Sequence, residues 1–187
     1  INFLPIPDSA ERLQALSAGD IDLMQTADTS TVVAAEEKNF AVQKVSGSSS
    51  TVIFFNTKAE PTNDVRVRQA LAYATNRQEM NDVGYKSARQ ISLSAFAPSS
   101  PYFNPDAQQP AYDPAKAKAL LEEYGKPVNI VLECISTPEA DLLLQVVKEN
   151  WEAVGVTVTL KTQEQGAYVA RMFSKKGDYQ AACFRTG

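Results

Sequence analysis

The spacing of apolar residues predicts an alternation of helices and strands in the second half of the chain. Apolar runs at 127–136, 156–162 and 178–184 read as strands, and residues 137–155 and 165–177 show helical spacing. The order is therefore strand, helix, strand, helix, strand, with short connections. That order is typical of an α/β fold in which helices cover a sheet.

The first sixty residues contain shorter elements of both kinds. Asp8 or Ser9 is placed to cap one helix that Gly19 ends, and a second capped helix follows. Serine-rich residues 46–50 separate the last two predicted strands of this part. The pattern predicts strands at 1–6, 21–24, 40–45 and 50–56, and helices at 8–20 and 28–39.

Residues 63–77 are predicted to form a helix that Asn63 or Asp64 caps. Its apolar stripe repeats at helical spacing and is rich in alanine, which allows close packing on a sheet. The stripe consists of Val67, Ala70, Leu71 and Ala74. Three arginines lie mostly off the stripe, and we interpret them as solvated or paired at the surface rather than as ligand contacts. They are Arg66, Arg68 and Arg77.

Residues 84–112 are rich in proline and turn-forming residues and are predicted to be a long loop. The rings of Tyr102, Phe103 and Tyr112 either line a ligand groove or fix the loop to the core, and the sequence leaves both readings open. A helix follows the loop. Asp113 is its N-cap, Pro114 its first residue and Gly125 its end.

The composition describes a globular chain that buries a core, with 44% apolar and 21% charged residues. The net charge of −4 and the lack of a Lys/Arg cluster argue against nucleic acid or an anionic membrane as partner. No apolar run is long enough to span a membrane. The chain begins and ends on apolar, strand-like runs, so we expect it to be a piece of a longer protein.

The residues that enzymes commonly use are scarce. The chain has no histidine, which excludes Ser-His-Asp and Cys-His catalysis and the commonest zinc ligand. No nucleotide-binding glycine motif and no metal-binding constellation is present, so we expect no cofactor and no metal. Cys134 and Cys183 lie in apolar runs. They are either two small buried strand residues or, if their strands are neighbours, a disulfide.

Four segments, in this order, resemble the family-5 extracellular solute-binding proteins of ABC importers, which carry dipeptides, oligopeptides, nickel complexes and some sugars. The resemblance covers nearly the whole chain. The segments are DSAERLQALSAGDIDLM, VIFFNTKAEPTNDVRVRQALAYATNR, YDPAKAKALLEEYG and VVKENWEAVGVTVTLKT.

The resemblance implies a type II periplasmic-binding-protein fold with two lobes that close on a ligand. Residues 1–52 would be part of lobe one leading to the hinge, and residues 53–187 a truncated lobe two. The helix at 63–77 would then pack the second lobe. The location would be the periplasm or the outer face of the cell membrane, where many members carry a lipid anchor, and the partner would be a membrane permease.

The resemblance also indicates ligand-facing positions: Asn56, Tyr102, Phe103, Gln165, Tyr168, Arg185 and Thr186. In peptide-binding members, an aspartate just past Gly187 receives the peptide's amino group. Relatives often have tryptophan where this chain has Gln165, and Gly-Trp near Arg185 and Thr186. A site with fewer rings and an arginine favours an anionic or polar ligand, which puts peptide binding in doubt.

Two other functions remain as alternatives to an importer's binding module. A hydrolase would need two carboxylates facing one cleft, and the sequence shows no obvious pair. A ligand-sensing receptor could use the same fold without transport. We also expect the fragment to bind ligand weakly by itself, and residues 1–50 to expose an apolar face through which it self-associates.

Overall fold

The computed structural model describes residues 1–45, 51–89, 91, 93–94, 96, 100–174 and 177–185. The chain divides into two compact units, Ile1–Ser46 and Gly47–Gly187. Each unit is considered by itself. Among the described residues, no helix combines the length and the apolar character needed to cross a membrane.

The first unit contains the two predicted helices. Helix α1 spans Ser9–Ala18 and helix α2 spans Thr29–Glu37. The Asp8 carboxylate accepts hydrogen bonds from the first backbone amides of α1, and Gly19 ends this helix with a positive φ of 81°. The Asp28 carboxylate caps α2 in the same way.

The strands predicted at 1–6, 21–24 and 40–45 are wrong, because residues 1–45 form no strand. Their apolar residues suit a strand, but a strand also needs a neighbour that accepts its backbone hydrogen bonds. No ladder supplies such a neighbour within this range.

The second unit is built on a four-stranded mixed sheet, as the sequence predicts. Its strands are β1 (Thr51–Phe55), β2 (Asn129–Ile135), β3 (Thr157–Gln163) and β4 (Ala181–Arg185). Their order in the sheet is β1-β4-β2-β3. Strand β2 runs parallel to both β3 and β4, whereas β1 is antiparallel to β4.

In the described part of this unit, five helices accompany the sheet: α3 (Val65–Ala74), α4 (Arg77–Tyr85), α5 (Pro114–Tyr124), α6 (Pro138–Glu152) and α7 (Gln165–Met172). The predicted caps of α5 and α6 are confirmed: Asp113 and Thr137 accept hydrogen bonds from amides of the first turns. The left-handed Gly125, with φ of 73°, ends α5.

The helix predicted at 63–77 is present as α3 but ends at Ala74, and a second helix, α4, begins at Arg77. Thr75 and Asn76 adopt extended backbone, with ψ of 109° and 92°, and this ends α3 at Ala74. The Asn76 side chain then caps α4, a helix that the sequence pattern did not predict and whose last two residues lie in the region predicted as loop. An Asn N-cap followed by Glu79 was a start signal that the longer helical pattern concealed.

The three arginines of this region also differ from one another. Arg66 forms the predicted surface ion pair, with its Nη2 2.7 Å from the Asp64 carboxylate. Arg68 and Arg77 are partly exposed and donate hydrogen bonds to backbone carbonyls, and whether they contact a ligand stays open.

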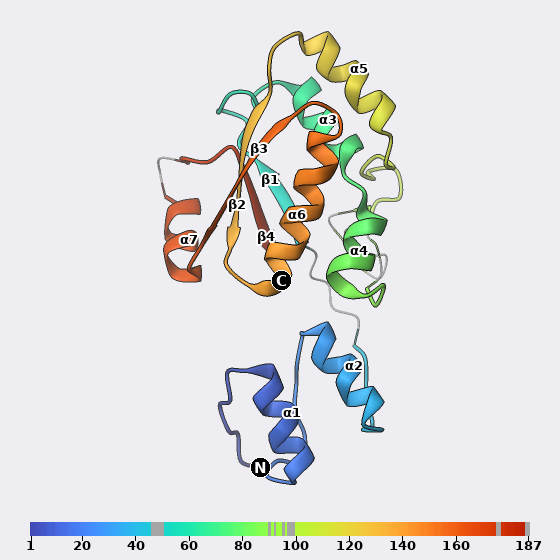
Figure 1. Ribbon diagram of the computed structural model, residues 1–187, viewed down its shortest axis with the longest axis vertical. Helices are drawn as coiled ribbons and strands as arrows, with labels where there is room; N and C mark the ends of the chain where they lie inside the picture. Colours follow the sequence, from blue (N-terminus) through green and yellow to red (C-terminus); the bar gives the residue numbers. More distant parts are fainter. Residues whose placement is uncertain are drawn as a thin grey trace. The chain divides into compact units, whose positions relative to one another are not determined.

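The core lies between the sheet and helices α3, α5 and α6, and α7 covers the opposite face (Figure 1). The predicted stripe of α3 is completely buried. Trp151 of α6 is also fully buried, and its Nε1 donates to the Thr75 hydroxyl over 3.0 Å. The break after α3 therefore supplies the hydrogen-bond partner that a buried indole requires.

Candidate ligand-binding site

The carboxyl ends of three parallel strands lie at one edge of the sheet. Strands β2, β3 and β4 all end there, and α6 and α7 begin directly after β2 and β3. The backbone amide of Ser136 donates to the carbonyl of Gln163 over 2.8 Å, which joins the two strand ends. Open α/β sheets bind ligands outside this carboxyl edge, so it is the candidate site.

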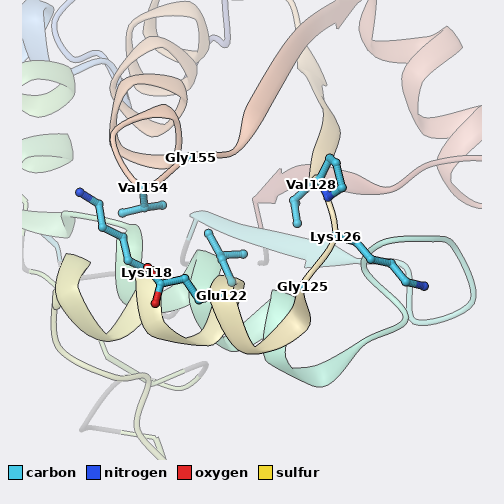
Figure 2. A pocket seen from close by; sticks show the side chains of 9 residues that line it. Lys118, Glu122, Gly125, Lys126, Val128, Val154 and Gly155 are labelled. Atoms are coloured by element: carbon cyan, nitrogen blue, oxygen red, sulfur yellow. The ribbon is translucent and has the colours of Figure 1, made fainter.

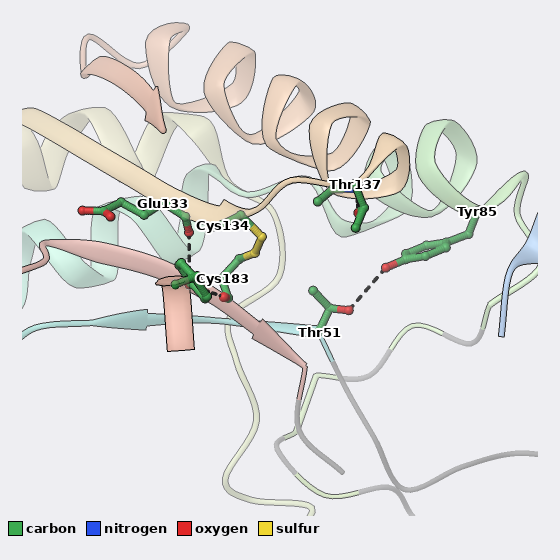
Figure 3. The surroundings of a disulfide bond; sticks show 8 residues. Thr51, Tyr85, Glu133, Cys134, Thr137 and Cys183 are labelled. Atoms are coloured by element: carbon green, nitrogen blue, oxygen red, sulfur yellow. Dashed lines mark hydrogen bonds between the residues drawn. A yellow bond between two sulfur atoms is a disulfide. The ribbon is translucent and has the colours of Figure 1, made fainter. Parts of the chain in front are cut away.

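A disulfide between Cys134 and Cys183 lies just beneath the edge (Figure 3). Strands β2 and β4 pair Leu132 with Ala181 and Glu133 with Ala182, and the next step brings the two cysteines together. Their Cα atoms are 5.1 Å apart, within the range that disulfides span. The alternative that the sequence left open is thus resolved in favour of the bond.

Tyr85 connects helix α4 to the same edge. Its hydroxyl lies 3.3 Å from the hydroxyl of Thr51, the first residue of the antiparallel strand β1 (Figure 3). Burial raises the pKa of Tyr85 above its ordinary value. The phenol therefore stays neutral at physiological pH and acts as a hydrogen-bonding group.

Helix α7 is fixed to the sheet by Tyr168 and by a buried ion pair. The Tyr168 hydroxyl donates to the backbone carbonyl of Cys183 and contacts that of Glu133, and burial raises its pKa to about 12. The Glu133 carboxylate is almost fully buried and pairs with Arg171 of α7. Gln163 donates to the same carboxylate over 3.2 Å.

The helix starts at this edge are capped by their own side chains. The Thr137 hydroxyl accepts the amide of Ala140 over 3.1 Å. The Glu164 carboxylate accepts the amide of Ala167, and the backbone amides of Gly166 and Ala167 lower the pKa of Glu164. Because the Thr137 hydroxyl and the Glu164 carboxylate already accept hydrogen bonds from these backbone amides, a ligand at this edge would contact mainly side chains.

The predicted site residues separate into three places. Gln165 is exposed at the start of α7 and Arg185 is the last residue of β4, so both lie at the carboxyl edge. Thr186 lies outside the described residues. Tyr168 lies beneath this edge, with its side chain buried.

Asn56 lies at the opposite end of β1. Its amide nitrogen donates to the carbonyls of Gly177 and Tyr179, over 2.7 and 2.9 Å, and so holds the turn before β4. Tyr102 and Phe103 lie in the loop after α4. Tyr102 is 74% exposed, and its ring centroid is 5.7 Å from that of Phe96. The ligand roles of these residues stay predictions.

A groove of about 450 Å³ opens at the other, amino edge of the sheet. Figure 2 shows Lys118 and Glu122 of α5 on one side and Val154 and Gly155 on the other. Its charged residues have mixed sign, and it lies at the edge where α/β sheets do not usually bind ligands.

The chemistry at the carboxyl edge is that of hydrogen bonding. Thr51, Tyr85 and Gln165 offer hydroxyl and amide groups, and the described residues contain no group of three or more side chains suited to a metal ion. Sequence reasoning missed the Thr51–Tyr85 contact and the Glu133–Arg171 pair. Charged residues within apolar strand and helix patterns were the available signal for the second.

The arrangement is a disulfide-linked α/β sheet whose carboxyl edge is lined by polar groups. The chain belongs to the bacterial extracellular solute-binding proteins of family 5, whose middle-region model matches residues 1–187. The resemblance inferred from the four sequence segments is thereby confirmed.

The curated relatives carry different ligands. The chain is 30% identical to the nickel-binding periplasmic protein of Escherichia coli, over 91% of this chain and 36% of the relative. It is 29% identical to the dipeptide-binding protein of the same organism, over 95% of this chain and 34% of the relative. The chain thus spans about a third of the length of these relatives.

Solved structures show the same fold. NikA from Brucella suis, in complex with Fe(III)-EDTA, superposes with a TM-score of 0.82 at 25% identity, over 97% of this chain and 40% of that one. DppA from Helicobacter pylori, in complex with the peptide STSA, superposes with a TM-score of 0.82 at 26% identity, over 97% of this chain and 35% of that one. The predicted type II periplasmic-binding-protein fold is confirmed for the part of the protein present.

Proposed function

We propose that this chain is part of the solute-binding component of an ABC-type importer. It captures a small solute such as a peptide and presents it to a membrane permease, without catalysis. The observation that carries the proposal is the family match over residues 1–187. Support comes from relatives whose names give nickel, dipeptide and heme binding, the last being heme-binding protein A of Haemophilus influenzae.

The second unit is proposed as most of lobe two and the first as a piece of lobe one. The proposed boundary near residues 52 and 53 lies close to the division after Ser46. Lobes of this kind close on a ligand by hinge motion.

The carboxyl edge of lobe two is proposed as its ligand-facing surface. Gln165, Arg185 and Thr186 are the proposed contacts there, and Arg185 favours an anionic or polar ligand. Asn56 and Tyr168 would act indirectly, because their polar atoms hold backbone around the sheet. Tyr102 and Phe103 would approach the ligand from the loop.

The family is extracellular or periplasmic, and the disulfide agrees with an oxidising compartment. Attachment to the membrane through a lipid at the N-terminus is proposed from the family resemblance alone.

A thermal-shift screen of the full-length protein tests the proposal. The ligand classes are dipeptides, oligopeptides, nickel chelates, heme and oligosaccharides. A ligand at a hundred times its Kd stabilises the folded state by about 2.7 kcal/mol, which raises the Tm by several degrees. Arg185→Gln should weaken binding of the identified ligand. Lys58→Gln makes the same charge change beyond the far end of β1 and should leave binding unchanged.

Two results would contradict the proposal. One is a Tm that none of the five classes raises. The other is a bound ligand whose cellular uptake is unaffected by deletion of the gene, which would favour the sensing receptor.

A further inference from the structure

A second cavity, of about 530 Å³, lies in the second unit between β1, α3 and α4. It follows β1 from Thr51 to Phe55, and Trp151 of α6 contributes to its wall. Small-molecule sites in proteins have volumes of about 300–1,000 Å³, so the cavity is large enough for a ligand.

Three arginines and no carboxylate line this cavity in the described part of the chain. Arg68 comes from α3, Arg77 from the first turn of α4, and Arg89 from the segment after α4. A cavity lined by charges of one sign concentrates counter-ions. Its lining therefore selects for a negative group.

Of the three arginines, Arg77 gives the strongest indication of an anion site. Its side chain is half-buried, and its Nη1 donates to the carbonyl of Pro110 over 3.0 Å. Within the described residues it forms no ion pair with a carboxylate, and burial lowers its pKa. A guanidinium has five N–H donors, so this bond orients the group and leaves donors for an anion.

Arg68 is held in a similar way, by the carbonyls of Thr62 and Asn63 over 2.8 and 2.9 Å. Arg89 is better balanced, since it lies over the Tyr85 ring at 4.3 Å and its Nη2 is 3.9 Å from the Glu139 carboxylate. Arg68 also interacts with the Asp64 carboxylate, whose pKa it helps to lower, so Arg77 is the cation that an anion would complete.

The remaining wall is partly apolar and includes Phe55 and Met80. We propose that this cavity binds a small organic anion, with its carboxylate or phosphate group on Arg77 and its apolar part against Phe55 and Met80. The cavity shares Thr51 and Tyr85 with the carboxyl edge proposed for the importer. Arg77, the cation that would bind the anion, instead comes from the first turn of α4, and the test of this site does not depend on transport.

Isothermal titration of the full-length protein with hexanoate, at fixed ionic strength, tests this site. Hexylamine has the same apolar body with the opposite charge, and should not bind. Arg77→Gln keeps a donor for the Pro110 carbonyl but removes the charge. It should weaken hexanoate binding by about tenfold to a hundredfold, the effect of one lost charge-assisted hydrogen bond.

Arg66→Gln is the matched control, because it makes the same charge change on α3 while its guanidinium pairs with Asp64 outside the cavity. Its hexanoate affinity should equal that of the native protein. Arg68→Gln provides a second cavity variant if Arg77→Gln does not fold, as judged by circular dichroism.

Three results would overturn the proposal. The native protein could show no hexanoate binding, as when a carboxylate from elsewhere in the full-length protein already fills the cavity. The folded cavity variant could bind as tightly as the native protein. The Arg66→Gln variant could lose as much affinity as the cavity variant, which would reveal a non-specific effect of net charge.

Discussion

Removal of the Cys134–Cys183 bond should cost a large part of the stability of the second unit. A crosslink stabilises mainly by restricting the unfolded chain. For the separation of 49 residues here, the chain-entropy model gives about 4 kcal/mol. Domains of this kind are stable by about 5–15 kcal/mol, so the loss is substantial.

Two perturbations separate the crosslink from packing. Reduction of the native protein breaks the bond and leaves both sulfur atoms in place. The double variant Cys134→Ala and Cys183→Ala also removes the sulfurs. Since Cys134 is only 1% exposed, this variant should lose about 1 kcal/mol more through the small void that remains.

Guanidinium unfolding with and without reductant measures both effects. The native protein should lose about 4 kcal/mol on reduction, and the double variant should not respond to reductant at all. Free thiols in the unreduced native protein, or a reductant effect below about 1 kcal/mol, would refute the reasoning.

Three further predictions concern other parts of the chain. Arg171→Met removes one cation from the buried Glu133 carboxylate, which keeps the hydrogen bond from Gln163 and Lys161 Nζ at 4.0 Å, and should lower the free energy of unfolding by about 1–3 kcal/mol; an unchanged unfolding midpoint would contradict this. The pKa of Asp64 is lowered to about 2, chiefly by its hydrogen bond from Arg66, so its stabilising contribution is present above the ordinary value of 3.8 and is lost as pH falls towards 2. Asp64→Asn retains an N-cap but removes the titrating carboxylate, so the Tm of this variant should fall less steeply with falling pH than that of the native protein. Equal slopes of Tm against pH in the two proteins would count against this prediction. Finally, apolar side chains such as Phe3 and Leu23 are 92% and 84% exposed, and light scattering should show that the isolated 187-residue chain self-associates; a monomer at high concentration would exclude it.

The sequence by itself determined the features that depend on a few neighbouring residues. The Asp113–Pro114 start and Gly125 stop of α5 were predicted correctly, because caps form between groups within one helical turn. The buried stripe of α3 and the strand–helix alternation after residue 127 were predictable for the same reason, as periodicity reflects which face is buried. The four segments that carry the family resemblance contain these same caps and apolar stripes.

The tertiary structure alone decided everything that requires a distant partner. The apolar run at 40–45 forms no strand, whereas the run at 181–185 becomes a central one, because only the second has neighbours to accept its hydrogen bonds. The pairing of Cys134 with Cys183 follows from the register of β2 against β4, which neither strand encodes by itself. Arg77 pointed to an anion site only once α3, α4 and β1 enclosed it in one cavity. Its burial, and the lack of a carboxylate in the described part of the cavity wall, are properties of the surroundings and not of the residue.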